Sequence, residues 1–232
     1  MPFSNVNERV AEARGLIADA VARGGLGQAV RIVAVTKTHG PDAVEAAWRA
    51  GLIDIGENKV QEALDKQDAV IAQRSWAAEL RWHLIGHLQR NKVKHLGRFE
   101  LLHALDSARL ADAVHEFGAQ RGRPVEALMQ VNIAGEETKG GFEASEVRTE
   151  ADRLRALDGV RVTGVMTMAP FDAPEGVLRR VFAGARTARD QLVEAGHPAR
   201  ELSMGMSGDY LLAVEEGATI VRLGTVLFGA RE

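Results

Sequence analysis

Residues 31–51 read RIVAVTKTHGPDAVEAAWRAG, and this stretch indicates which class of fold the chain adopts. Its first part is a run of apolar, mostly β-branched residues, which is typical of a buried strand. The turn that follows contains Gly40 and Pro41, and the remainder has the apolar spacing of an alanine-rich helix. The stretch therefore predicts a strand, a turn and a helix, with Lys37 at the end of the strand.

The same unit recurs along the rest of the chain. Further predicted strands lie at 53–58, 81–86, 100–106, 125–133, 160–168, 201–206 and 219–229. Predicted helices lie at 41–51, 59–74, 89–97, 107–122, 144–159, 176–196 and 207–217, and residues 5–23 form one more before the first strand. Regular alternation implies parallel strands with right-handed crossovers. We therefore predict an α/β fold, a single (β/α)₈ TIM-type barrel over residues 1–232, with the extra N-terminal helix outside the barrel or across its N-terminal end.

The composition is that of an ordinary globular protein, with 46% hydrophobic and 26% charged residues. No apolar run is long enough to cross a bilayer, and the N-terminus lacks the basic-then-apolar order of a signal peptide. The absence of cysteine excludes disulfides, thiolate metal ligands and cysteine nucleophiles. The formal net charge of −3 argues against general nucleic-acid binding. We therefore expect a cytoplasmic monomer that binds neither membranes nor nucleic acid.

Residues 87–98, HLQRNKVKHLGR, are a local basic exception. Their cationic side chains are typical of a solvated helix face, and an anion site or a partner surface is the alternative. The sequence does not decide between these roles.

Lys37 lies at the carboxyl end of the first predicted strand, which is where barrels of this type place their chemistry. Apolar surroundings would lower the pKa of its amine and leave enough neutral amine to form a Schiff base with an aldehyde. A lysine at a strand end can also simply point into solvent. The residues at the other strand ends therefore decide between a Schiff-base lysine and a solvent-facing one.

Two loops near the C-terminus favour an anion site. Ser207 follows the seventh predicted strand in SMGMSGD and is a natural N-cap for the helix that comes next, and Gly205 and Gly208 would let a ligand approach the backbone closely. The eighth strand contributes Gly224 and Thr225 in VRLGT, with Arg222 on the same strand. Because phosphate groups are often held by the loops after strands seven and eight of such barrels, the two loops together predict a phosphate site.

Other polar residues are less specific. Asn58 could face a ligand ring or cap the helix that follows it. His83 and His87 are four residues apart, but the strand pattern and Gly86 argue against one helical face, so we predict no metal site. Methionines that could line an aromatic ring, or simply pack in the core, occur at 166, 168, 204 and 206.

Eight ordered motifs closely resemble those of the pyridoxal phosphate homeostasis protein family, nearly from end to end. They are AVTKT, GEN-K-VQEA, WHLIGHLQRNK, HALDS, VNIAGEETKGGF, GVMTMAP, LSMGMSGDY and VRLGTVLFGAR. The resemblance implies a barrel of the alanine racemase N-terminal type. It also implies pyridoxal 5′-phosphate (PLP) bound as an internal aldimine, in a protein that delivers this cofactor or buffers its free level.

The resemblance also implies a role for each matching residue. These residues are Lys37 as the aldimine lysine, Asn58 beside the ring, Arg222 at the pyridine nitrogen, Ser207, Gly224 and Thr225 at the phosphate, and Met204 and Met206 next to the pocket. The sequence departs from the family pattern in THGP at 38–41 and in Lys59 after GEN. Both departures concern the rim of the pocket.

Arg222 bears on catalysis as well. A charged guanidinium that donates to the pyridine nitrogen disfavours protonation there and makes the ring a weaker electron sink. Alanine racemases tolerate such an arginine but add a second domain that supplies a catalytic tyrosine, whereas the one tyrosine here, Tyr210, lies in the helix predicted after the phosphate loop. We therefore expect a protein of vitamin B6 homeostasis that holds PLP, possible partners being PLP-dependent apoenzymes, without robust turnover.

Two enzyme functions remain as alternatives. One is a PLP-dependent amino-acid racemase or decarboxylase that acts with a partner domain. The other is a Schiff-base aldolase that uses Lys37 and the phosphate loops, with Asp106 or Asn132 as its acid or base.

Overall fold

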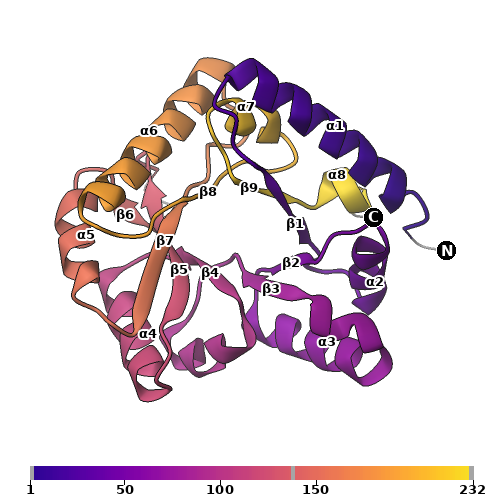
Figure 1. The fold of residues 1–232 in the computed structure, drawn as a ribbon, viewed down its shortest axis with the longest axis horizontal. Coiled ribbons are helices and arrows are strands. Elements are labelled where there is room, and N and C mark those ends of the chain that lie inside the picture. The colour runs from indigo at the N-terminus through magenta and orange to yellow at the C-terminus, as the bar shows by residue number, and fades with distance from the viewer. Residues whose placement is uncertain (1–2, 137–138, 230–232) are drawn as a thin grey trace.

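The computed structural model describes residues 3–136 and 139–229, in which eight parallel strands form a closed barrel (Figure 1). The other residues of the predicted 1–232 domain, 1–2, 137–138 and 230–232, lie outside the described ranges. Neighbouring strands follow the order β1-β2-β3-β4-β5-β7-β8-β9, and β9 pairs with β1 to close the ring. The strands are β1 Arg31–Val35, β2 Asp54–Glu57, β3 Arg81–Leu84, β4 Leu101–Leu105, β5 Val125–Asn132, β7 Val160–Met166, β8 Glu201–Ser203 and β9 Ile220–Leu223. The short β6, Phe142–Glu143, pairs only with β5. The predicted barrel and its eight strands are confirmed.

Helices cover the outside of the barrel (Figure 1). They are α1 Val6–Gly24, α2 Pro41–Arg49, α3 Val60–Gln73, α4 Ala108–Gln120, α5 Val147–Arg155, α6 Glu175–Glu194, α7 Tyr210–Glu215 and α8 Thr225–Phe228, with 3₁₀ helices η1 Ser75–Glu79 and η2 Arg90–Arg98. The N-terminal α1 packs against α2, α7 and α8 on the outside of the barrel, which is one of the two positions predicted for it. No helix in the described ranges has the length and apolar character needed to cross a bilayer.

Three predicted elements differ from the structure. The strand predicted at 219–229 ends at Leu223, and α8 follows it, because a short apolar run does not distinguish a strand from a buried helical turn. The strand predicted at 201–206 ends at Ser203. The helix predicted at 89–97 is the 3₁₀ helix η2, whose buried Val93 and Leu96 have the three-residue spacing of that geometry.

Alternating side chains on the strands form two layers. On β9, Ile220 belongs to a small apolar cluster with Val33 and Met166, whereas Val221 belongs to the larger cluster that contains the buried helix residues. Arg222 is the next residue in the phase of Ile220, and it is buried. The period of two thus places a polar residue of β9 on the barrel's interior side, among the small apolar cluster.

Candidate functional site

A cavity of about 920 Å³ opens at the carboxyl ends of the strands and is lined by loops from around the barrel. This volume is within the range of small-molecule sites. The sequence-predicted residues that line it are Lys37, Asn58, Met206, Ser207, Arg222, Gly224 and Thr225. The fold thus brings together residues that are up to 188 positions apart, from 37 to 225.

Met204 is the exception among the predicted site residues. It is fully buried in the larger hydrophobic cluster and does not line the cavity. Ser203 ends β8 with its hydroxyl inside the barrel, in contact with His103 and Arg222, so the following side chain lies on the opposite side. Met206, two residues further on, is partly exposed and does line the cavity.

Buried charges hold the backbone before Lys37. Lys66 Nζ of α3 donates to the carbonyl oxygen of Thr36 at 2.8 Å and pairs with Glu57 at 2.5 Å. The same Glu57 oxygen accepts from the Thr36 hydroxyl at 2.5 Å. Burial raises the pKa of Glu57, although the hydrogen bonds from Lys66 and Thr36 act in the opposite direction. Sequence reasoning missed this cluster, because Lys66 reads as an ordinary charged position in a helical pattern.

The backbone after Lys37 is fixed as well. Thr38 has a φ of 69°, an uncommon left-handed conformation for a threonine, and its N–H donates to Glu62 of α3 at 2.5 Å. Strained backbone at a ligand site persists where surrounding contacts determine it. Lys37 therefore lies in a turn anchored to α3 on both sides, beyond the end of β1 at Val35.

Arg222 lies at the floor of the cavity with its guanidinium committed to two acceptors. Nη1 donates to Ser203 Oγ at 2.6 Å, and Nη2 donates to the carbonyl oxygen of Thr167 at 3.0 Å. The residue is 5% exposed, and this burial lowers its pKa to about 10, opposed by the charge of Asp209. Arg222 therefore remains cationic at neutral pH.

Ser207 joins the two loops that were predicted to bind phosphate. Its Oγ accepts from the backbone N–H of Val226 in α8 at 3.2 Å. It does not cap the next helix: α7 begins at Tyr210, and the residue at its N-cap position is Asp209, whose carboxylate accepts from the N–H of Met206 in the loop at 2.6 Å. The predicted capping role of Ser207 is thus wrong, and its predicted position beside Gly224 and Thr225 is supported by the shared cavity lining.

Asn58 lines the cavity and does not cap α3. The N-cap of that helix is Lys59, and no side-chain hydrogen bond caps it. A Cβ on Gly86 would lie 2.4 Å from the Asn58 carbonyl oxygen, so glycine is required where the loop after β3 crosses Asn58. In the sequence, Gly86 after the third strand is the one sign of this close contact.

The two histidines of WHLIGH lie in different surroundings. His83 is fully buried within the barrel, whereas His87 lies at the cavity rim with its Nδ1 2.6 Å from Asp106 Oδ2. Asn132 does not line the cavity, because its amide bonds the backbone of Glu136 and Lys139. Across residues 3–136 and 139–229, no group of three or more His, Cys, Asp or Glu side chains could hold a metal ion.

Comparisons with known proteins now bear on this cavity. Residues 19–232 match the N-terminal domain of alanine racemase. The pyridoxal phosphate homeostasis protein of Aquifex aeolicus is 40% identical over 98% of this chain and 99% of its own, and that of Mus musculus is 37% identical over 87% and 77%. The chain belongs to the pyridoxal phosphate homeostasis protein family.

Solved structures agree with this assignment. The family member PipY of Synechococcus elongatus, solved with PLP bound, is 35% identical, covers 97% of this chain and 100% of its own, and superposes with a TM-score of 0.83. Alanine racemase from Corynebacterium glutamicum superposes with a TM-score of 0.75 at 15% identity, and the match covers 62% of that enzyme. The likeness to the racemase shows the shared barrel alone.

The cavity of this homeostasis-family chain also contains residues that the sequence did not single out. Gln130 and Lys139 line it, and Lys139 pairs with Glu136 at 2.7 Å. Lys139 lies within the family motif VNIAGEETKGGF, which is the one signal that could have indicated it. Tyr210 is buried and does not line the cavity, and burial raises the pKa of its hydroxyl.

Proposed function

We propose that the chain binds PLP in the cavity at the carboxyl ends of the strands and holds it by a covalent bond to Lys37. The observation that carries the proposal is that one cavity is lined by a lysine, a buried arginine and the two joined loops at Ser207 and Gly224. PLP has an aldehyde, a pyridine nitrogen and a phosphate, and each has a matching group here.

The residues fit the cofactor chemically. Lys37 would supply the amine that condenses with the aldehyde, with loss of one water molecule. The phosphate would be bound by the hydroxyls of Ser207 and Thr225, in the two loops that the hydrogen bond between Val226 and Ser207 joins. Arg222 would donate to the pyridine nitrogen, where its fixed charge disfavours ring protonation. PLP when bound supplies an electrophilic carbon and an electron sink, and Arg222 weakens the second of these.

We further propose that the chain stores or delivers PLP, as one domain and one monomer in the cytoplasm, to apoenzymes that require it, without robust turnover. Three features support this role over racemase or decarboxylase chemistry: the charge of Arg222, the burial of Tyr210 and the exposure of the cavity rim at Phe171, which is 99% exposed. The aldolase alternative needs an acid or base in the cavity. Asn132 does not line the cavity, and Asp106, the other candidate, pairs with His87 at the rim.

The test is borohydride reduction of the protein loaded with PLP, followed by peptide mass mapping. We expect the reduced cofactor on Lys37, no label in Lys37→Ala, and full labelling in the control Lys139→Ala, which removes the other cavity lysine. Lys37→Ala should still bind PLP non-covalently through its phosphate, more tightly than it binds pyridoxal. Label on Lys139, or equal affinity for the two vitamers, would contradict the assignment.

A further inference from the structure

Six polar side chains form a hydrogen-bonded line that starts at Arg222 in the cofactor cavity and runs through the inside of the barrel to its opposite face. We call them the interior chain. Its links are Arg222 Nη1 to Ser203 Oγ at 2.6 Å, Ser203 Oγ to His103 Nδ1 at 2.8 Å, His103 Nε2 to His83 Nδ1 at 3.0 Å, His83 Nε2 to Asp54 Oδ1 at 2.9 Å and Asp54 Oδ2 to Arg81 Nη2 at 2.7 Å.

The donor and acceptor of each hydrogen bond in the interior chain follow from which atoms carry hydrogen. Burial opposes ionisation of Asp54, but the hydrogen bond from His83 and the Arg81 guanidinium lower its pKa, so Asp54 only accepts. His83 then donates from Nε2 and accepts at Nδ1 from His103 Nε2–H. His103 in turn accepts at Nδ1 from the Ser203 hydroxyl, which accepts from Arg222. Every link is satisfied when both imidazoles are neutral and carry their proton on Nε2.

Burial favours this neutral arrangement. Ser203, His83 and His103 are all 0% exposed. Burial holds the pKa of His103 well below its usual range, and the positive charges of Arg222 and Arg31 act in the same direction. A broken link would leave a polar atom unsatisfied in a low dielectric, so such a network fixes its members in one geometry.

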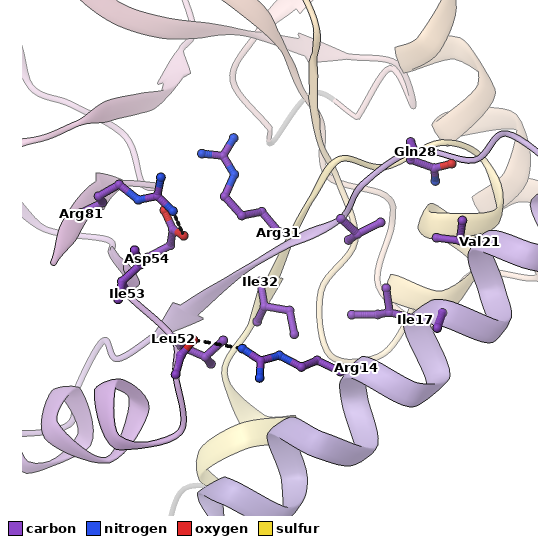
Figure 2. A pocket seen from close by; sticks show the side chains of 13 residues that line it. Arg14, Ile17, Val21, Gln28, Arg31, Ile32, Leu52, Ile53, Asp54 and Arg81 are labelled. Carbon is purple, nitrogen blue, oxygen red and sulfur yellow. Dashed lines mark hydrogen bonds and ion pairs between the residues drawn. The ribbon is translucent and has the colours of Figure 1, made fainter. Parts of the chain in front are cut away.

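The far end of the interior chain lies at the opposite face of the barrel. Asp54 and Arg81 are the first residues of β2 and β3, and both line a second cavity of about 610 Å³ beneath α1. Figure 2 shows their ion pair on one side of this cavity and the α1 residues Arg14, Ile17 and Val21 on the other. The Arg81 side chain is 40% exposed, so the interior chain of hydrogen bonds ends where solvent can reach it.

We infer that Asp54, His83, His103 and Ser203 are positioning residues for Arg222, and that the interior chain couples the ion pair at the N-terminal face to the guanidinium in the cofactor cavity. This inference rests on the proposed function for its consequence, which is that Arg222 faces the cofactor ring. If an amide replaces the Asp54 carboxylate, only one acceptor oxygen remains for His83 and Arg81; when Arg81 takes it, an N–H faces His83 Nε2 and both imidazoles can change tautomer. The Ser203 hydroxyl then no longer presents its oxygen to Arg222 in one fixed orientation.

The first experiment compares Asp54→Asn with wild type, both loaded with PLP. We expect a shifted visible absorption band, a shifted pH midpoint for that band and about threefold to tenfold weaker PLP binding, the range for one weakened hydrogen bond. Glu201→Gln is the matched control, because Glu201 is the first residue of β8 and pairs with Arg31 at 2.5 Å without belonging to the interior chain. It should keep the wild-type band.

A second variant guards against loss of folding. Arg81→Gln changes a partly exposed side chain and retains the Asp54 carboxylate, so it should fold and shift the band in the same direction by a smaller amount. If the folded variants Asp54→Asn and Arg81→Gln both keep the wild-type band, pH midpoint and affinity, the coupling does not exist.

A second measurement does not depend on the cofactor. In ¹⁵N-labelled protein without PLP, nitrogen shifts should report His83 and His103 as neutral Nε2–H tautomers at pH 7, with a change at both in Asp54→Asn. An Nδ1–H tautomer at either residue in wild type overturns the interior chain. Wild type that shows the expected tautomers but binds no PLP would contradict the proposed function and leave the network supported.

Discussion

At the scale of single residues, burial decides which groups remain charged. Arg222 keeps its charge despite a lowered pKa, and Asp54 remains ionised because His83 and Arg81 compensate its burial. His103 has no carboxylate partner, since its ring contacts His83 and Ser203. The interior therefore contains a neutral imidazole whose protonation the fold opposes.

This gives a pH dependence with a defined sign. The folded pKa of His103 lies well below 6.5, so below about pH 6.5 the unfolded chain binds a proton that the folded chain does not. The free energy of unfolding should therefore fall with decreasing pH, His103 contributing a slope of about 1.4 kcal/mol per pH unit. Urea unfolding between pH 7 and 5 measures the slope.

The matched comparison is His103→Gln, which removes the titrating group and keeps a polar side chain. Its stability should be lower at pH 7. Its free energy of unfolding should nevertheless fall less steeply with decreasing pH than that of wild type, by the slope that one bound proton contributes. Parallel slopes in the two proteins would show that His103 is protonated in the folded state.

At the scale of elements, the loop between β8 and α7 depends on one glycine. Gly205 has a φ of 89°, and a Cβ there would lie 2.7 Å from Ala213 Cβ and 2.8 Å from Tyr210 Cα. The loop therefore folds tightly onto α7, which fixes the position of Ser207 and its bond to Val226. Glycine at 205 serves the packing of the loop, not the approach of a ligand.

Gly205→Ala should consequently lower the free energy of unfolding by about 1–3 kcal/mol, from backbone strain and the contact with α7. PLP affinity should fall as well, because Ser207 moves with the loop. Gly208→Ala is the control in the same loop: a Cβ there meets no atom within 4 Å, and its φ is not positive. Denaturant unfolding that gave equal losses for both variants would contradict this account.

At the scale of the whole molecule, the barrel has a cavity at each end and a polar line between them. The cavity at the carboxyl ends contains the groups that we propose bind PLP, and the cavity beneath α1 contains the ion pair of Asp54 and Arg81. Closure of the ring between β9 and β1 brings Arg222 to the same cavity as Lys37. Binding of the proposed cofactor therefore depends on both ends of the chain.

The proposed carrier role predicts little amino-acid chemistry. Incubation of the PLP-loaded protein with L- and D-alanine in deuterated water should give less than one equivalent of deuterated alanine per protein and no racemisation. The reasons are the charge of Arg222 and the burial of Tyr210 away from the cavity. Mass and chirality analysis measure both products. Multiple turnovers that disappear in Lys37→Ala would restore the racemase alternative.

The sequence by itself determined the barrel and most of the cofactor cavity. Alternating strand and helix patterns allow few architectures, and the carboxyl ends of parallel strands meet at one face. Lys37 and the Ser207 loop could therefore be predicted together from their positions after strands, and Arg222 from its place on the last strand. The period of two along β9 also accounts for the polar residue on the inside of the barrel.

Only the tertiary structure decided where strands end and which polar groups meet. Met204 lies outside the cavity because its side chain is on the opposite side from Ser203 and packs in the larger hydrophobic cluster. Lys66 and Glu57 are nine residues apart, whereas His103 and Ser203 are 100 apart, and nothing local marks either pair as partners. Such contacts arise when the barrel closes and removes these groups from water, so that each polar atom has to find its partner within the protein.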